Sequence, residues 1–322
     1  MIMDKKKQNL FVFMLGALAM IGPLNIDTCL PALSHISKDF DVAFSDVEIS
    51  MSLFFLFFGV GQLFGGYYSD RKGRKVIVVS GLLISLFASI LLIFSNELYS
   101  FYLGRAIQAI GGGFVGVSIA AIVRDNFTGK DAASVMSLIT MIAMGAPLVA
   151  PTIGATLLKF FTWHSIFLFI AIYSIIVLIP FVLKIKNEVP DQSKNISFFG
   201  GLKKVYSNKS ALAYMTVMAI PSGALYTYLT TAPFVYQEFF QLSESHFAII
   251  FGLNGGALII MNKVNSVLVQ KHSPRKLLHI GLFIHLSTLT LILISMLIYT
   301  PQIYIVLPLL TLHLSSLGLL SG

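Results

Sequence analysis

Two ionisable side chains lie deep inside stretches of sequence that are otherwise apolar. Asp27 is in the first of these stretches and Arg105 is in the fourth. A charge at the centre of a bilayer costs about 2.5–3.5 kcal/mol on insertion scales, so such residues are kept where they face a partner or a water-filled path. A carboxylic acid in that setting can take up and release a proton. The sequence therefore indicates a polar site that works inside a membrane.

The two side chains are expected at the same depth. Asp27 comes six residues before the outer end of its stretch, and Arg105 six residues after the outer start of its own. At about 1.5 Å of rise per residue, both would lie roughly 9 Å deep, so we expect them to meet. Withdrawing Arg105 or excluding water would then favour proton uptake by Asp27, which is a means of proton coupling. A static ion pair that only fixes helix packing remains the alternative.

The elements that carry these residues are expected to be membrane-spanning helices. Of the 322 residues, 56% are hydrophobic and only 11% are charged. Apolar runs of about 20 residues, the length that crosses a bilayer, recur along the whole chain. The sequence predicts an all-α integral membrane protein with about ten transmembrane helices, at Phe11–Leu33, Glu48–Ser69, Val76–Phe94, Tyr99–Arg124, Ser134–Phe161, Ser165–Lys184, Ala211–Phe240, Phe247–Val269, Leu277–Thr300 and Gln302–Gly322.

Basic residues set the expected orientation. Lys and Arg gather in alternate loops, such as Arg71–Lys75 and the lysine-rich segment 185–210, and loops of this kind stay on the cytoplasmic side. We therefore expect a multi-pass protein of the bacterial inner (plasma) membrane with a cytoplasmic N-terminus. The net charge of +8 is dispersed over several loops rather than gathered in one patch, which argues against a nucleic-acid partner.

The spans lack the groups that an enzyme would need. They contain no nucleophile paired with a base and no paired carboxylates, and the chain has no nucleotide-binding Gly-x-x-x-x-Gly-Lys-Ser/Thr motif. Cys29 is the only cysteine, so no disulfide can form within the chain, and no Cys/His cluster has the spacing of a metal site. We expect no enzymatic activity, no metal and no cofactor.

A repeat organises the spans. Residues 1–184 carry six of them, residues 185–210 form a central loop expected in the cytoplasm, and residues 211–322 carry four. Sliding the second part over the first by about 201 positions sets Arg275–Lys276 opposite Arg74–Lys75. Two parallel six-helix repeats are a recurring plan of secondary transporters. The same offset sets Gly322 opposite Ala121, so we expect the last two helices of the second repeat to be missing.

The inner end of the second span carries a motif of glycines and charges, Gly66-Tyr67-Tyr68-Ser69-Asp70-Arg71-Lys72-Gly73-Arg74-Lys75, with Gly59, Gly61 and Gly65 before it. Glycines allow close helix approach and, at Gly73, a tight turn. Asp70 would lie at a helix C-terminus, where the macrodipole opposes a negative charge, so it needs a cation. Arg74 and Arg124 are the candidates, and a pair that breaks on opening would form an inner gate; a topology anchor is the alternative. The expected gate residues are Gly66, Asp70, Arg71, Gly73, Arg74, Arg124 and Asp125.

The fifth span contains Gly145, Pro147, Pro151 and Gly154. Two prolines four residues apart remove backbone donors and kink a helix, while small residues allow close packing. The span is therefore suited to rocking one side of the molecule against the other, although a static kink would have the same sequence.

Together these motifs resemble those of a known family. Segment 66–75 is similar to the signature loop of the major facilitator superfamily, Leu103–Gly113 to its arginine-containing motif, and Gly145–Gly154 to its antiporter motif. Asn25–Leu33, the pair Arg124-Asp125 and Trp163–Phe167 resemble the bicyclomycin/chloramphenicol resistance (Bcr/CflA) branch of drug/proton antiporters. The resemblance covers essentially the whole chain.

This resemblance implies a multidrug efflux antiporter that confers antibiotic resistance. Small amphipathic drugs would leave by alternating access, and proton uptake at Asp27 would compete with drug binding in a central cavity. The proton gradient would supply the energy, so the partners would be the drug, protons and the lipid bilayer. We expect a monomer.

The seventh span offers aromatic and hydroxyl groups for that cavity. Tyr226, Tyr228 and Thr231 are the expected cavity residues, and the repeat offset sets Tyr228 opposite Asp27. Ordinary packing of these side chains is the alternative. His285 and His313, in the ninth and tenth spans, could relay protons or could be hydrogen-bonded helix contacts.

Two other functions stay open. An inward proton symporter of a small metabolite would be expected to line its cavity with more charge than one acid and one base. A polytopic receptor or a non-transporting, truncated remnant would fit a chain that lacks its last two helices.

Overall fold

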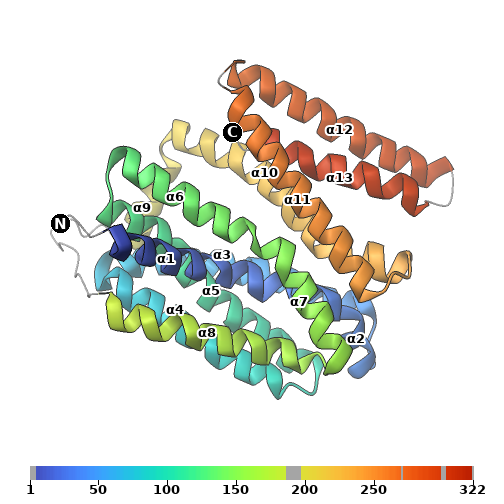
Figure 1. Ribbon diagram of the computed structural model, residues 1–322, viewed down its shortest axis with the longest axis horizontal. Coiled ribbons are helices and arrows are strands. Elements are labelled where there is room, and N and C mark those ends of the chain that lie inside the picture. The colour runs from blue at the N-terminus through green and yellow to red at the C-terminus, as the bar shows by residue number, and fades with distance from the viewer. Residues whose placement is uncertain (1–4, 186–196, 270, 299–301, 321–322) are drawn as a thin grey trace. The chain divides into compact units, whose positions relative to one another are not determined.

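The computed structural model describes residues 5–185, 197–269, 271–298 and 302–320, and all regular structure in these ranges is helical. The chain divides into two compact units, Met1–Phe198 and Phe199–Gly322 (Figure 1). Eight helical stretches among the described residues are long and apolar enough to cross a membrane. The all-α membrane fold predicted from the sequence is confirmed.

The N-terminal unit follows the first six predicted spans. Its helices are α1 (Lys5–Asp27), the short 3-10 helix η1 (Leu30–Ala32), α2 (Leu33–Asp39), α3 (Phe44–Lys72), α4 (Arg74–Ile93), α5 (Leu98–Asn126), α6 (Gly129–Met144), α7 (Ala146–Phe160) and α8 (His164–Lys184).

Two predicted spans are interrupted. The α-helix of the first ends at Asp27, and the chain continues as η1 and α2, with Pro31 in the interruption. Pro31 has no backbone N–H, so it cannot donate the next hydrogen bond of α1. The fifth span is divided at Gly145, just before Pro147, into α6 and α7. The kink expected from the prolines therefore takes the form of a break.

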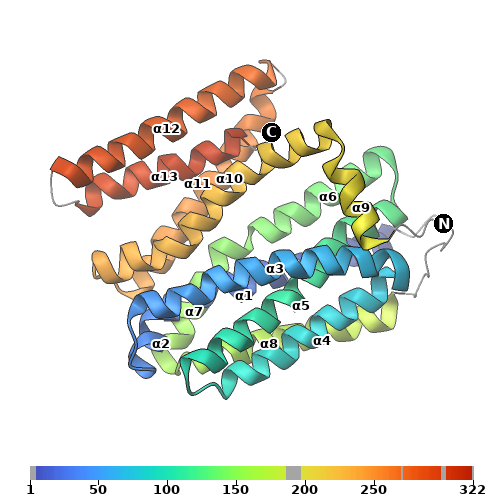
Figure 2. The same cartoon turned by 180° about the vertical axis from the view of Figure 1, so that it is seen from behind.

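Glycines bring α5 against the backbones of both α3 and α4 (Figure 2). A Cβ atom added at Gly113 would lie 2.5 Å from the carbonyl oxygen of Phe58 in α3. On another side of α5, a Cβ atom added at Gly111 would lie 2.6 Å from the carbonyl oxygen of Gly81 in α4. Small residues at such positions allow close van der Waals packing, which holds helices together in a bilayer.

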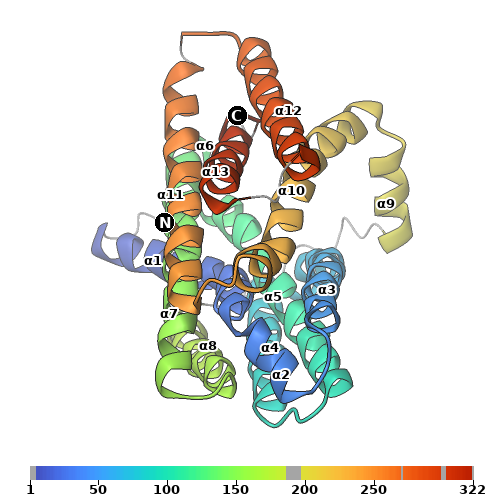
Figure 3. The same cartoon turned by 90° about the vertical axis from the view of Figure 1, so that its right-hand side faces the viewer.

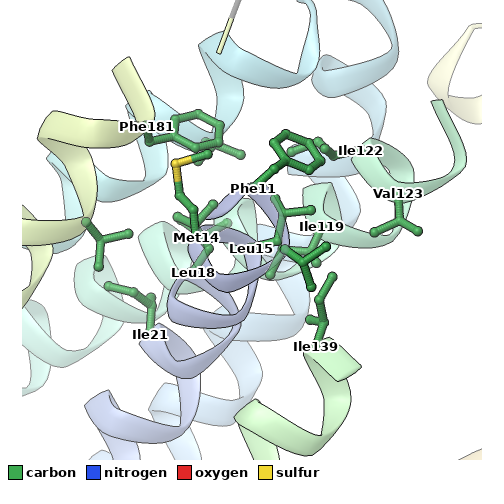
Figure 4. Packing of buried hydrophobic residues seen from close by; sticks show 14 of the residues in the cluster. Phe11, Met14, Leu15, Leu18, Ile21, Ile119, Ile122, Val123, Ile139 and Phe181 are labelled. Atoms are coloured by element: carbon green, nitrogen blue, oxygen red, sulfur yellow. The ribbon is translucent and has the colours of Figure 1, made fainter. Parts of the chain in front are cut away.

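The core of this unit surrounds α1. One face of α1 packs against α5, α6 and α8, and Figure 4 shows side chains from all four helices in contact. Most of the residues that α1 contributes to this core lie three or four positions apart, as expected for the packed face of a helix. They are Phe11, Val12, Met14, Leu15, Leu18 and Ile21.

The C-terminal unit repeats this plan. After α9 (Phe198–Tyr206), it contains α10 (Lys209–Pro233), the π-helical turn η3 (Phe234–Phe239), α11 (Glu244–Leu268), α12 (Pro274–Ile298) and α13 (Ile303–Leu320). In this unit α13 packs against α11 and α12, as α5 packs against α3 and α4 (Figure 3).

The register of the repeat is visible in the helix starts. α3 and α11 begin at Phe44 and Glu244, and α4 and α12 begin at Arg74 and Pro274. The two described non-glycine residues with positive φ, Asp41 and Gln241, also lie 200 residues apart, each with φ 53°. The two units therefore correspond at an offset of 200 residues in their turns as well as in their helix packing.

Candidate functional site

Arg105 is fully buried in α5, yet its guanidinium forms no ion pair with a described acidic residue. Its Nη1 donates hydrogen bonds to the backbone carbonyl oxygen of Asn25 and to Oε1 of Gln108, each at 2.7 Å. The guanidinium also lies over the ring of Phe54, 4.5 Å from its centroid. Gln108 in turn donates to the hydroxyl of Ser89 on α4 at 3.0 Å. Arg105 thus ties α5 to α1, α3 and, through Gln108, to α4.

The carbonyl that Arg105 binds is available because α1 ends there. In a continuing α-helix the N–H of Cys29 would bond to the carbonyl oxygen of Asn25, but it bonds to that of Ile26 at 3.1 Å. The Asn25 carbonyl is thereby left for Arg105. A cation at a helix C-terminus also interacts favourably with the helix dipole. Arg105 therefore caps the C-terminus of α1.

Asp27, the last residue of α1, is only 2% exposed. Its carboxylate makes no hydrogen bond or ion pair with any residue that the structure describes. The expected contact with Arg105 is therefore wrong for this structure. The side chain of Asn25 points to α4, where it reaches Ser85 at 3.4 Å. Two residues further along a helix is about 200° of rotation, so Asp27 points away from the helices that hold Arg105.

The antiporter motif packs on the segment that follows Asp27. A Cβ atom added at Gly154 of α7 would fall well inside van der Waals contact of the Thr28 carbonyl oxygen, and it would lie 3.3 Å from Cγ of Pro31. Pro151, one turn earlier in α7, is buried, and Pro147 and Gly145 are half-buried at the break between α6 and α7. The structure thus brings Gly154 and the segment after Asp27 together.

Arg74 is the partner of Asp70. Arg74 contacts Oδ1 of Asp70 at 2.5 Å and Oδ2 of Asp125 at 2.9 Å. Arg74 is the first residue of α4, Asp70 lies near the end of α3, and Asp125 lies near the end of α5. One guanidinium therefore joins the ends of three helices. Arg124, the other candidate, is exposed and forms no ion pair with a described residue.

The remaining residues of this motif have separate roles. Gly73 has φ 94°, a conformation that L side chains rarely adopt, and it forms the turn between α3 and α4. The guanidinium of Arg71 lies 4.4 Å from the ring centroid of Tyr67. A Cβ atom at Gly66 would meet only the Val117 side chain at an ordinary 3.5 Å.

The glycines before the motif divide into two kinds. Gly61 and Gly65 approach the backbone of α5, because an added Cβ atom would lie 2.6 Å from the Ile110 carbonyl oxygen and 3.0 Å from the Phe114 Cα, respectively. Gly59 has nothing within 4 Å of an added Cβ atom. Close approach to α5 therefore explains Gly61 and Gly65 but not Gly59.

The expected cavity residues of the seventh span lie in different surroundings. Tyr228 is 8% exposed, and its hydroxyl accepts a hydrogen bond from Nδ2 of Asn254 at 2.8 Å. Tyr226 is 41% exposed, and Thr231 is exposed with its hydroxyl bonded to the Thr227 carbonyl of its own helix. Corresponding helices of the two units start 200 residues apart, so the position that corresponds to Asp27 in the sequence is Thr227 rather than Tyr228.

Two polar contacts were not expected from the sequence. Asn254 of α11 joins three elements, because its Nδ2 also donates to Tyr236 at 3.3 Å and its Oδ1 accepts from Thr311 of α13 at 2.6 Å. Lys75 Nζ donates to the Val182 carbonyl near the end of α8 at 2.7 Å. An asparagine inside an apolar span was the available signal for the first. No signal in the sequence pointed to the second.

Comparison with known proteins agrees with this architecture. The sequence profile of the Major Facilitator Superfamily matches residues 13–322. A bicyclomycin resistance protein homolog of Haemophilus influenzae is 31% identical over 301 residues, which cover 91% of this chain and 75% of the relative. The multidrug resistance protein MdtL of Salmonella paratyphi C is 26% identical over 288 residues, covering 85% of this chain and 73% of the relative.

A solved structure shares the fold. A bacterial homolog of the human lysosomal transporter Spinster, in an inward-facing and unoccupied conformation, superposes with a TM-score of 0.74 at 15% identity, over 99% of this chain and 75% of the other. The protein is a transporter rather than an enzyme. It belongs to the major facilitator superfamily, among the drug transporters that resemble the bicyclomycin/chloramphenicol resistance proteins.

Proposed function

We propose that this protein exports small amphipathic drugs across the bacterial inner membrane in exchange for protons. The observation that carries the proposal is Asp27, a carboxylic acid that is 2% exposed and has no partner among the described residues. Burying an ionised carboxylate without a partner is costly, so the group needs a proton or a cation to remain there. Proton uptake and the binding of a drug would therefore compete at Asp27.

Arg105 supports this assignment by being engaged elsewhere. Its guanidinium is held by Asn25 and Gln108, so it does not neutralise Asp27 in this conformation. A carboxylate already paired with arginine would have little need of a proton. Capping α1 also fixes the end of the helix that carries the acid. We therefore assign Arg105 as a positioning residue for the Asp27 segment.

Alternating access would move α7 relative to the end of α1. Gly154 lets α7 lie directly on the Thr28 carbonyl, and the break at Gly145 separates α7 from α6. A motion of α7 would therefore displace Thr28, the residue next to Asp27. At the inner end, the ion pairs of Arg74 with Asp70 and Asp125 would have to break or rearrange for α3, α4 and α5 to separate, which is the role expected of an inner gate.

The rest of the assignment follows the expectations from the sequence. The N-terminus is proposed to lie in the cytoplasm, because Lys and Arg gather in alternate loops. Tyr226, Tyr228 and Thr231 are proposed to contribute to drug binding, and the protein is proposed to act as a monomer. No cofactor enters the cycle, because the proton gradient supplies the energy.

The test compares two acid-to-amide variants. Asp27→Asn removes the proton site, whereas Asp41→Asn changes an exposed acid in the turn after α2, where asparagine tolerates the positive φ. Each protein is expressed in a pump-deficient bacterium, and export of a dye or a chloramphenicol-like drug is measured with and without an uncoupler. We expect uncoupler-sensitive export by the wild type and Asp41→Asn, and its loss in Asp27→Asn. Normal export by Asp27→Asn at neutral pH would refute the proton role of Asp27.

The same cells distinguish the two alternatives. A proton symporter of a small metabolite would accumulate its substrate when the membrane is energised, so the direction of transport separates it from an exporter. A non-transporting remnant or a receptor would move no substrate in either direction, although it would reach the membrane in normal amounts.

A further inference from the structure

Two histidines face each other in the middle of the C-terminal unit. His285 lies near the centre of α12, and His313 lies near the centre of α13. Their rings are stacked, with centroids 3.9 Å apart and planes inclined by 24°. Both side chains are half-buried. Ionisable side chains at the centre of a membrane span mark functional sites more often than packing sites.

The hydrogen bonds define which nitrogen of each ring is engaged. The Ser316 hydroxyl donates to the His313 carbonyl at 2.5 Å, so its oxygen accepts from Nδ1 of His285 at 3.0 Å. Nδ1 of His313 lies 3.3 Å from the His285 carbonyl oxygen, which can only accept, and 3.3 Å from the Thr288 hydroxyl. The network therefore assigns the Nδ1–H tautomer to both rings.

This tautomer leaves Nε2 of each ring with a lone pair. Neither Nε2 makes a hydrogen bond with a residue that the structure describes. A proton added at Nε2 would therefore break none of the contacts that hold the rings. The pair is built so that it can change its charge without losing its geometry.

No charged side chain that the structure describes contacts the pair. The helices packed around it are α10 and α11, together with α12 and α13 themselves. Among their described side chains, the titratable ones are Lys209, Tyr226, Tyr228, Glu244, His246, Lys263, Lys276, His279 and Tyr304. None of these forms a hydrogen bond or an ion pair with either imidazole.

Helix packing alone does not explain two imidazoles here. Within the same unit, α11 and α13 are already joined by neutral groups, the amide of Asn254 and the hydroxyl of Thr311. Neutral groups of that kind could link α12 and α13 equally well. The choice of histidine adds a capacity that a Ser, Thr or Asn contact lacks, which is to take up a proton between about pH 5 and 8.

We propose that His285 and His313 form a second proton-binding site of this protein, a stacked pair that accepts one proton at Nε2. Two positive charges at a ring separation of 3.9 Å would repel strongly in a membrane interior, so the pair holds one proton and resists a second. The proton site itself does not depend on drug export. Its participation in the transport cycle rests on the function proposed above.

The experiment is an NMR titration of ¹⁵N-histidine-labelled full-length protein in lipid nanodiscs from pH 4 to 9. Imidazole ¹⁵N shifts report both the tautomer and the protonation of each ring. The single variants His285→Asn and His313→Asn assign the two signals by their disappearance. His279→Asn is the matched control, because it changes an exposed histidine of the same helix α12.

We expect the wild-type pair to show the Nδ1–H tautomer and to take up one proton in this range, with the second proton bound at least about one pH unit lower. In each single variant, the remaining imidazole should titrate in one step without that separation, whereas His279→Asn should leave the pair unchanged. Two rings that titrate independently, with curves that the partner's removal does not alter, would overturn the proposal. So would a pair that stays neutral down to pH 4.

Export assays separate this site from the proposed function. If Asp27→Asn abolishes export while the titration of the pair is unchanged, both proposals stand as independent sites. If the wild type exports nothing, the NMR titration still decides whether the pair binds a proton. If export is present and the histidine variants keep the wild-type pH profile, the pair has no part in the transport cycle.

Discussion

At Gly113 of α5, one added methyl group would meet the backbone of a neighbouring helix. A Cβ atom there would lie 2.5 Å from the Phe58 carbonyl oxygen and 2.8 Å from the Gln62 backbone nitrogen of α3. Both neighbours are backbone atoms of a helix and cannot rotate away. Relief to an ordinary contact of about 3.4 Å would require α3 and α5 to separate by almost 1 Å, and overpacking of this kind costs about 1–3 kcal/mol.

Gly116, one turn further along α5, provides a matched control. Its added Cβ atom would lie 3.6 Å from the Phe58 ring and 3.9 Å from Nε2 of Gln62, which are ordinary contacts with side chains of the same two residues. There the substitution should gain the helix propensity of alanine, about 0.5–1 kcal/mol in soluble helices. Both substitutions gain this propensity, so Gly113→Ala should be less stable than Gly116→Ala by the overpacking cost alone, roughly 1–3 kcal/mol.

Thermal unfolding of the purified variants in one detergent gives the comparison, with fluorescence-detected size exclusion as the readout of folded protein. We expect the order of melting temperatures to be Gly116→Ala, wild type, Gly113→Ala, with the first two close together. A Gly113→Ala protein that melts at or above the Gly116→Ala protein would show that α3 and α5 are not in backbone contact, and the packing inferred for the N-terminal unit would fail.

Two further substitutions test the charged contacts. Arg74→Gln should lose both of its ion pairs and lower the free energy of unfolding by about 0.5–2 kcal/mol at low salt, with a smaller loss at 0.5 M salt, because exposed pairs are screened. Arg124→Gln removes a neighbouring arginine that does not pair with Asp70 or Asp125, so it should leave stability unchanged. Equal melting temperatures for the two variants would contradict the ion pairs assigned to Arg74. Arg105→Gln should remove the hydrogen bonds from the charged guanidinium to the Asn25 carbonyl and to Gln108, at a cost of about 1.5–3 kcal/mol each. Arg105→Lys should not restore them, because lysine lacks the planar array of N–H donors of a guanidinium. A fully stable Arg105→Lys protein would count against the assignment of Arg105 as the cap of α1.

The sequence was sufficient where the relevant geometry is local. Asp70 and Arg74 are four residues apart across the end of one helix and a glycine turn, and Arg74 was one of the two cations expected near Asp70 from the sequence. The apolar spans and the distortion of the fifth span near Pro147 are likewise properties of short segments. Membrane helices are easily recognised in this way, because every backbone polar group must be satisfied within its own helix.

The sequence was insufficient where rotation about a helix axis decides a contact. Asp27 and Arg105 were placed at the same depth, but Arg105 bonds to the carbonyl of Asn25 at the end of α1 and forms no ion pair with Asp27. Arg124 and Asp125 differ by one residue, or about 100°, and it is Asp125 that reaches Arg74. The stacking of His285 on His313 depends in the same way on how α12 and α13 face each other.

The two units share one plan but differ in how their buried polar groups are satisfied. In the C-terminal unit the buried amide of Asn254 has partners at both ends, on Tyr228, Tyr236 and Thr311. In the N-terminal unit Asp27 has none, and Nε of Arg105 and Oδ1 of Asn25 are buried without a hydrogen bond. A network whose hydrogen bonds are all made resists rearrangement, whereas one with unpaired buried groups is stabilised by any group that pairs with them. The end of α1 should therefore respond to a bound drug more strongly than the satisfied network of Asn254, and protection from hydrogen exchange near Asn25–Thr28 should change with drug while that around Asn254 stays constant. Equal changes in both units would contradict this division of roles.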